Sequence, residues 1–138
     1  MKALLLGIGL LATGSAFACK CPQYPLPEQM KHANVVFVGS TQASLLQPGK
    51  QGEAITFNVS RGIKGVQTGA TIAIDPSFET DCTAHFKPGI QFLVFAYKAG
   101  TGALTASACS VRAAEPISIG GQITQPAPET LKFLKGGT

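Results

Sequence analysis

Two cysteines near the start of the chain, Cys19 and Cys21, flank a single lysine, Lys20. Thiols at this spacing can bind a soft metal such as copper, or can exchange disulfides with a partner. Two further cysteines, Cys82 and Cys109, lie far along the chain and offer disulfide partners to both. Structural disulfides are therefore the favoured interpretation, and a redox or copper-binding pair is the alternative.

The residues before this pair are typical of a secretory signal. One charge, Lys2, precedes an apolar run, and small residues end the segment at Ala18. The apolar run is too short to span a bilayer. We therefore expect a signal peptide at residues 1–18 and cleavage between Ala18 and Cys19. The mature domain, residues 19–138, would be secreted or periplasmic and would begin with a free α-amine on Cys19.

A cysteine directly after the cleavage point also fits lipid anchoring, which normally ends in acylation of the amine. The usual lipoprotein pattern has a leucine three residues before the cysteine and small residues around it. In this chain Ala16 occupies the leucine position and bulky Phe17 follows it. A lipoprotein is therefore the less favoured prediction.

Four cysteines in an exported chain predict two disulfides, because the destination is oxidising. A bridge between Cys19 and Cys21 would close a ring too tight for good geometry. The two other connectivities both link the N-terminal cysteines to Cys82 and Cys109, and both stay open at this point. Each such bridge closes a long loop and would stabilise the fold by about 4 kcal/mol.

Length and composition indicate one domain after the signal. The chain has 138 residues, with 11 basic and 7 acidic side chains and a formal charge of +4. These charges are scattered rather than clustered, which argues against nucleic-acid binding. No second long apolar segment follows the first, so no membrane span is expected in the mature protein, which we expect to be a monomer.

Five stretches rich in β-branched or aromatic residues, or with alternating apolar residues, predict strands at residues 34–46, 53–60, 71–74, 90–97 and 103–109. Turns separate them, and no repeat is present. This pattern predicts an all-β fold with small flanking helices, in the form of a five-stranded OB-fold barrel. The expected core residues are Val36, Val38, Ile55, Phe57, Val59, Ile72, Ile74, Phe92, Val94, Phe95 and Leu104.

The flanking segments are expected to be short helices and loops. A helix is expected at residues 28–33 and another at residues 129–135, the latter with Leu131 and Leu134 facing inward. Proline and glycine favour irregular structure elsewhere. Turns or loops are therefore expected at residues 47–52, 61–65, 75–89 and 112–128.

No catalytic motif is present in the sequence, which lacks His-Glu-x-x-His, Gly-x-Ser-x-Gly and a phosphate-binding glycine loop. We therefore expect no enzymatic activity and no cofactor. His32 and His85 are expected to be surface or turn residues. Asp75, Glu79 and Asp81 offer carboxylates to a calcium ion, but solvated loop charges are the favoured interpretation.

A set of short motifs runs from Cys19 to about Arg112. They are Cys-x-Cys-Pro at the cleavage site, residues 33–39 (ANVVFVG), Ile63-Lys64-Gly65, Cys82, residues 89–96 (GIQFLVFA) and Cys109-Ser110. Together they resemble the netrin-like module, and most closely the N-terminal domain of the tissue inhibitors of metalloproteinases and their bacterial relatives.

This resemblance implies an OB barrel that carries a wedge formed by the mature N-terminus. The wedge is bridged from its first and third residues, which gives a disulfide-stapled N-terminus. By resemblance, Cys19 pairs with Cys82, and Cys21 pairs with Cys109.

The resemblance also implies a function, inhibition of zinc metallopeptidases. In inhibitory members the α-amine and carbonyl of the first residue bind the target's catalytic zinc, and the second side chain enters the adjoining specificity pocket. Here these roles fall on Cys19 and Lys20. The chain needs no metal of its own, because the zinc belongs to the target. The surrounding ridge would comprise Cys21, Pro22, Thr80 and Asp81.

The chemistry of the terminus is compatible with these roles. A catalytic zinc keeps a coordination position for water, which a neutral amine and a nearby carbonyl can occupy instead. Lys20 replaces the small or hydroxyl residue of the animal inhibitors, so the target's pocket needs an acidic end. Lys31 stands where those inhibitors have a further cysteine. The alternative function is a secreted or periplasmic netrin-like binding module without protease-inhibitory activity.

Overall fold

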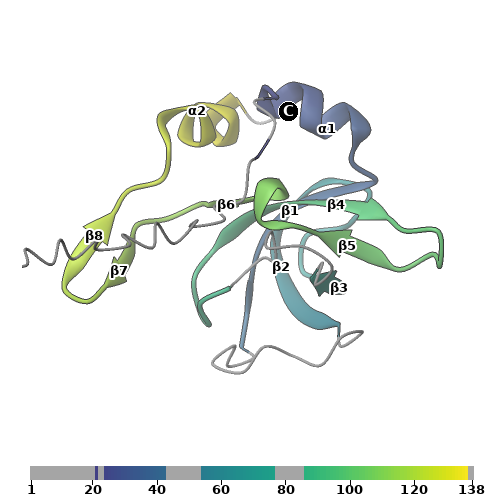
Figure 1. Ribbon diagram of the computed structural model, residues 1–138, viewed down its shortest axis with the longest axis horizontal. Helices are drawn as coiled ribbons and strands as arrows, with labels where there is room; N and C mark the ends of the chain where they lie inside the picture. The colour runs from purple at the N-terminus through teal and green to yellow at the C-terminus, as the bar shows by residue number, and fades with distance from the viewer. Residues whose placement is uncertain (1–20, 22–23, 43–53, 77–85, 137–138) are drawn as a thin grey trace, which may run out of the picture.

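The computed structural model describes Cys21 and residues 24–42, 54–76 and 86–136 (Figure 1). The described chain is mostly β, with a closed barrel of five strands and two small helices outside it. In chain order the elements are α1 (Leu26–His32), β1 (Val35–Thr41), β2 (Ile55–Lys64), β3 (Thr71–Pro76), β4 (Phe92–Lys98), β5 (Leu104–Ala106), the 3₁₀ turn η1 (Ala108–Ser110), β6 (Val111–Ala113), β7 (Ile117–Ile119), β8 (Gln122–Thr124) and α2 (Pro128–Gly136).

The barrel closes through the strand order β1-β2-β3-β5-β4 and back to β1. Four of these pairings are antiparallel, and the pairing between β3 and β5 is parallel. This arrangement is the five-stranded OB-fold barrel that the sequence predicted. Closure pairs both edges of every barrel strand, so the barrel has no long open edge.

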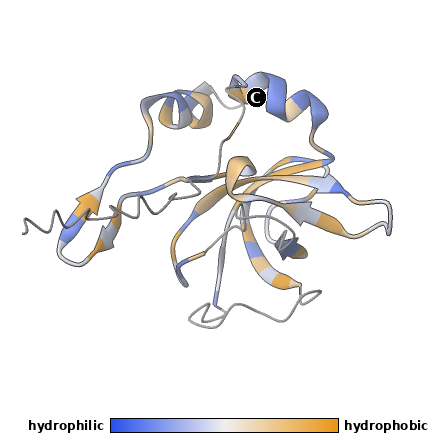
Figure 2. Cartoon of the chain, in the orientation of Figure 1, coloured by the Kyte–Doolittle hydropathy of each residue, from blue (hydrophilic) through white to orange (hydrophobic). Residues whose placement is uncertain are grey.

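The second strand shows how the sequence specifies burial. Along β2, Ile55, Phe57 and Val59 are buried, and the residues between them are exposed, which Figure 2 shows as alternating colours. The strand continues to Lys64, so the turn predicted at residues 61–65 is wrong. Its second half also pairs with β1, with two register shifts at which Ser60 and Ile63 of β2 are extra residues, as in β-bulges.

One glycine permits the close approach of β1 and β2. A Cβ atom on Gly39 would lie 2.6 Å from the carbonyl oxygen of Asn58, closer than any side chain tolerates. The register shift between Val38 and Gly39 falls at the same place. Glycine is therefore required where β1 approaches the backbone of β2 at this shift.

The barrel interior is built around four aromatic rings in edge-to-face contact. The ring centroids of Phe37 and Phe57 lie 5.5 Å apart, those of Phe57 and Phe86 4.8 Å, and those of Phe86 and Phe92 5.3 Å. Such offset contacts are the favoured geometry for aromatic pairs. Among the predicted core residues, those that lie in this cluster are Ile55, Phe57, Val59, Ile74, Phe92 and Val94, with Ile72 and Leu104 half-buried beside it.

A second cluster fills the space between the barrel and the helices. Val36, Val38 and Phe95, predicted for a single core, belong here, together with Leu26, Ala33 and Leu93. The members of this cluster in β1 and β4 lie on the opposite face of these strands from the aromatic rings, because successive strand residues point to opposite faces. The prediction of one core is therefore corrected to two, since both faces of β1 and β4 are buried.

The two helices lie together on one side of the barrel (Figure 1). The first helix starts two residues earlier than predicted, with Pro27 in its first turn. In α2 the prediction for Leu131 is wrong, because this side chain is 39% exposed. Thr130 is fully buried instead, and Phe133 and Leu134 pack on the second cluster.

The tail predicted as a loop contains three short strands. β6 continues the sheet along β4, and β7 and β8 form a separate hairpin that extends from the barrel in Figure 1. A Gly120-Gly121 turn with positive φ at both residues joins the hairpin strands, which is the geometry that glycine favours. The loop prediction for residues 112–128 is therefore corrected.

Candidate functional site

The predicted bridge between Cys21 and Cys109 is present. It joins residues 88 positions apart in the sequence. Cys21 precedes α1, and Cys109 belongs to η1, so the bridge fixes the segment before the first helix to the barrel. The predicted OB barrel with a disulfide near its N-terminus is thus the observed structure.

The cysteine of the barrel lies on a turn that interrupts a β-ladder. β5 and β6 pair with successive parts of β4, and η1 lies between them along the chain. A reciprocal capping box fixes this turn. The Ser107 hydroxyl accepts a hydrogen bond from the Cys109 amide at 3.3 Å, and the Ser110 hydroxyl accepts one from the Ser107 amide at 3.0 Å. The polar residues on either side of Cys109 therefore hold it in a defined position.

Arg112 supports the same turn from β6. Its Nη1 atom donates hydrogen bonds to the carbonyl oxygens of Cys109, at 2.9 Å, and of Val111, at 3.0 Å. Its charge also acts on Tyr97, whose pKa is raised by burial and lowered in part by the guanidinium. Arg112 thus contacts the turn that carries Cys109 and also acts on the half-buried Tyr97.

Most of the predicted inhibitory ridge lies outside the described residues. This applies to Cys19, Lys20, Pro22, Thr80, Asp81 and Cys82, and so to the bridge expected between Cys19 and Cys82. Glu79 and His85 also lie outside them. Of the other residues singled out, His32 is exposed at the end of α1 and Asp75 is half-buried in β3. In the described ranges, no three His, Cys, Asp or Glu side chains are grouped to hold a metal ion.

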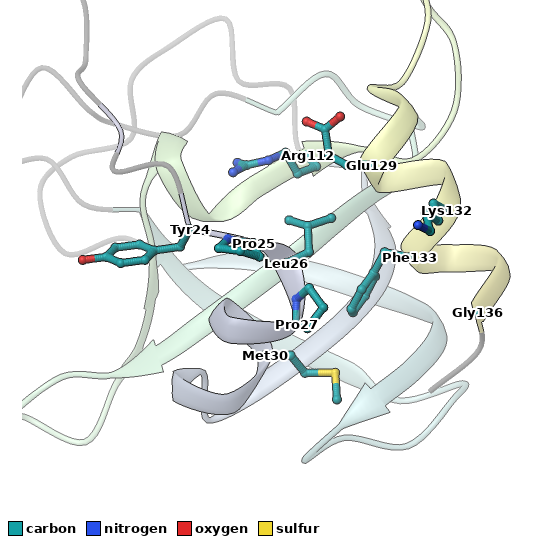
Figure 3. A pocket seen from close by; sticks show the side chains of 10 residues that line it. All are labelled: Tyr24, Pro25, Leu26, Pro27, Met30, Arg112, Glu129, Lys132, Phe133 and Gly136. Atoms are coloured by element: carbon teal, nitrogen blue, oxygen red, sulfur yellow. The ribbon is translucent and has the colours of Figure 1, made fainter.

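A pocket lies between the two helices, next to the bridged segment (Figure 3). Its volume is about 670 Å³, within the range of roughly 300–1,000 Å³ typical of small-molecule sites. The apolar part comes mainly from Pro25, Leu26, Pro27, Met30 and Phe133, and the other lining residues are Tyr24, Arg112, Glu129, Lys132 and Gly136. No local sequence pattern predicts this pocket, because its walls come mainly from two helices that are far apart in the chain.

Two cations from β2 fix the helices that form the pocket. Lys64 donates from Nζ to the carbonyl oxygens of Met30, at 2.9 Å, and Lys31, at 3.2 Å, near the C-terminal end of α1. Arg61 donates to the carbonyl oxygen of Leu134 in α2 at 2.9 Å. Cations at these positions satisfy carbonyl groups that the last turn of a helix leaves without partners. One strand of the barrel therefore anchors both helices.

No family model, curated protein or solved structure matches this chain. Within the described residues, no helix is both long enough and apolar enough to cross a membrane.

Proposed function

We propose that the protein is a secreted inhibitor of zinc metallopeptidases, which inserts its mature N-terminus at the catalytic zinc of the target. The α-amine and carbonyl of Cys19 would bind the zinc. Lys20 would enter the adjoining pocket, and Cys21, Pro22, Thr80 and Asp81 would form the contact ridge. Export and removal of residues 1–18 are part of this proposal, because the amine must be the true terminus.

The observation that supports this proposal most directly is the bridge between Cys21 and Cys109 on an OB barrel. Two residues of chain span at most about 7 Å, so a terminus at Cys19 would stay close to the bridge. A terminus tethered in this way loses little conformational freedom when it docks, which favours binding. Such a terminus is also a poor substrate for the peptidase, because the bridge opposes the separation of the two chain ends after cleavage.

The charge of Lys20 defines the expected target. A deep apolar pocket would have to bury the ammonium group without a partner, which is costly. A pocket with a carboxylate at its end would instead form a charge-assisted hydrogen bond with it. We therefore expect the susceptible peptidases to be those whose pocket next to the zinc has an acidic residue.

The test compares two forms of the mature protein, one that starts at Cys19 and one with a single alanine added before it. Both are titrated against a panel of zinc peptidases. The added residue displaces the amine from the zinc, so the native form should inhibit and the extended form should lose inhibition by at least about 100-fold. A Lys20→Met variant with a native terminus is the matched control, because it changes the side chain that enters the target's pocket and leaves the amine in place. Equal inhibition by the native and extended forms would contradict the proposed mechanism.

The second candidate is a netrin-like binding module without inhibitory activity. The observation in its favour is the pocket between α1 and α2, whose described lining comes from the two helices, the segment before α1 and β6. Failure of both forms to inhibit any zinc peptidase would favour this candidate. The intact mass of the secreted protein adds an independent check, since it reports the cleavage site, the number of disulfides and any acyl group.

A further inference from the structure

We propose that the pocket between α1 and α2 binds an amphipathic carboxylate, namely a medium-chain fatty acid. Its apolar chain would lie between the two helices, and its carboxylate would be bound by the guanidinium of Arg112. The residues that would bind this ligand are not those proposed to bind zinc, and the binding of a fatty acid does not depend on protease inhibition.

The apolar part of the pocket fits a hydrocarbon chain. Leu26 and Phe133 come from different helices and both line the pocket, and Met30 lies further along α1 (Figure 3). Pro25 and Pro27 extend this surface and, through their fixed rings, limit how far the wall can change shape. The flexible, polarizable side chain of Met30 can adapt to ligands of different shape. A chain enclosed here removes apolar area from water on both partners.

The charged residues select an anion as the head group. Among the described lining residues, Arg112 and Lys132 are basic and Glu129 is acidic, which gives this part of the lining a net positive charge. In the part of the chain that the structure describes, none of these three side chains forms an ion pair. A ligand carboxylate can therefore bind Arg112 without breaking an existing salt bridge, and Lys132 adds a second positive charge to the pocket.

The geometry of Arg112 is suited to this contact. The hydrogen bonds of its Nη1 atom to the Cys109 and Val111 carbonyls fix the guanidinium in place. Guanidinium has five N–H donors, and the remaining ones are arranged in a fork that matches the two oxygens of a carboxylate. A pre-positioned arginine loses little side-chain entropy when the ligand binds.

Decanoate is a suitable probe, and the test uses calorimetric titration of the mature protein together with amide chemical shifts. We expect one saturable site per chain, with the largest shifts in α1 and α2. Decanol has the same chain but no charge, and it should bind at least about tenfold more weakly, because a charge-assisted hydrogen bond is lost. Equal binding of decanol and decanoate would overturn the proposal.

Two exposed residues one turn apart on α2 provide a matched pair of variants. Lys132→Gln removes an attraction and should weaken decanoate binding by about fivefold, whereas Glu129→Gln removes a repulsion and should strengthen it by a similar factor. Lys135→Gln, in the same helix but outside the pocket, should leave the affinity unchanged. These residues are on the surface of the helix, so all three variants should fold.

A second control addresses binding elsewhere on the surface. Ile119 and Ile123 on the β7–β8 hairpin are each 67% exposed and offer an alternative apolar surface. The double variant Ile119→Thr, Ile123→Thr should retain decanoate binding. Loss of binding in this variant, or equal affinities in Lys132→Gln and Glu129→Gln, would show that the pocket is not the site.

Discussion

The barrel interior and the layer between the barrel and the helices are both apolar, but they differ in how they are packed. The interior holds four phenylalanine rings in successive edge-to-face contact. The helical layer has one tilted ring pair, Phe95 with Phe133, and it also contains Gln29 and Thr130, each of which buries a side-chain oxygen that has no hydrogen-bond partner among the described residues. The pocket also lies in this layer.

This difference indicates a division between stability and function. Buried polar atoms without partners and incomplete filling both cost free energy, so the helical layer is expected to be the less stable part. Its helices are anchored instead by cations from β2 and by the bridge from Cys21 to Cys109. Regions of lower local stability are where binding sites and moving elements are usually found.

The strongest test of this comparison truncates one aromatic ring in each region. Phe57 is fully buried among the barrel rings, so Phe57→Ala should lower the free energy of unfolding by about 3–5 kcal/mol. Phe133 is half-buried in the helical layer, so Phe133→Ala should cost less than half as much. Urea denaturation of both variants measures the two values. Equal losses would mean that the helical layer is packed as tightly as the barrel.

Removal of the bridge should have the next largest effect. The double variant Cys21→Ser, Cys109→Ser opens a loop that joins residues 88 positions apart, and should lower the free energy of unfolding by about 2–4 kcal/mol. Hydrogen exchange should accelerate more in α1 than in the barrel strands, because α1 directly follows the tethered segment. A uniform acceleration would show that the bridge stabilises the barrel and the helical layer alike.

Loss of the helix-anchoring cations should have a smaller and local effect. Lys64→Met or Arg61→Met each leaves carbonyl groups at a helix end without a partner, and should cost about 1 kcal/mol. Exchange should increase at the end of α1 in the first variant and at the end of α2 in the second. Lys98→Met is the matched control, since the exposed ammonium of Lys98 makes no described hydrogen bond. A loss in the control equal to that in the variants would count against the anchoring role.

The smallest expected effect is on pH dependence. Burial raises the pKa of Tyr97 above its usual value of 10.0, so the folded state retains the phenol proton more strongly than the unfolded state does. The corresponding stability is fully present below pH 10 and is lost as the pH rises through the raised pKa. In a Tyr24→Phe background Tyr97 is the one remaining tyrosine, and its absorbance titration should have a midpoint above 10.

Arg112 provides the control for this titration. Its charge partly offsets the effect of burial, so adding Arg112→Gln should move the midpoint further upward. A downward movement would mean that the guanidinium does not act on Tyr97 in this way.

The barrel strands were predictable wherever one face of a strand is buried. In β2 the alternation of Ile55, Phe57 and Val59 with polar residues identifies both the strand and its inward face. In β1 all of the first five residues are buried, so alternation gives no information about faces. Val36 and Val38 are buried as predicted, but the sequence does not show that they face the helices, or that Phe37 between them faces the barrel interior.

The helical layer was less predictable, because its contacts join distant segments. In α2, two sets of residues fit one face of a helix: Leu131 with Leu134, and Thr130 with Phe133 and Leu134. Hydropathy favours the first set, which is the wrong one because Leu131 is exposed and Thr130 is buried. The β7–β8 hairpin does have a local signal, since apolar residues alternate with polar ones on both sides of Gly120-Gly121. The pocket and the role of Arg112 have no local signal at all.

Among the described residues, the parallel pairing of β3 with β5 completes the circle of strands through two residue pairs, Asp75 with Thr105 and Pro76 with Ala106. Proline has no amide hydrogen to donate, which leaves this junction with fewer hydrogen bonds than its short length already allows. Thermal fluctuations that split the cylinder should therefore begin here. The same junction is where a graft or a designed cut in the chain would disturb the remaining strands least.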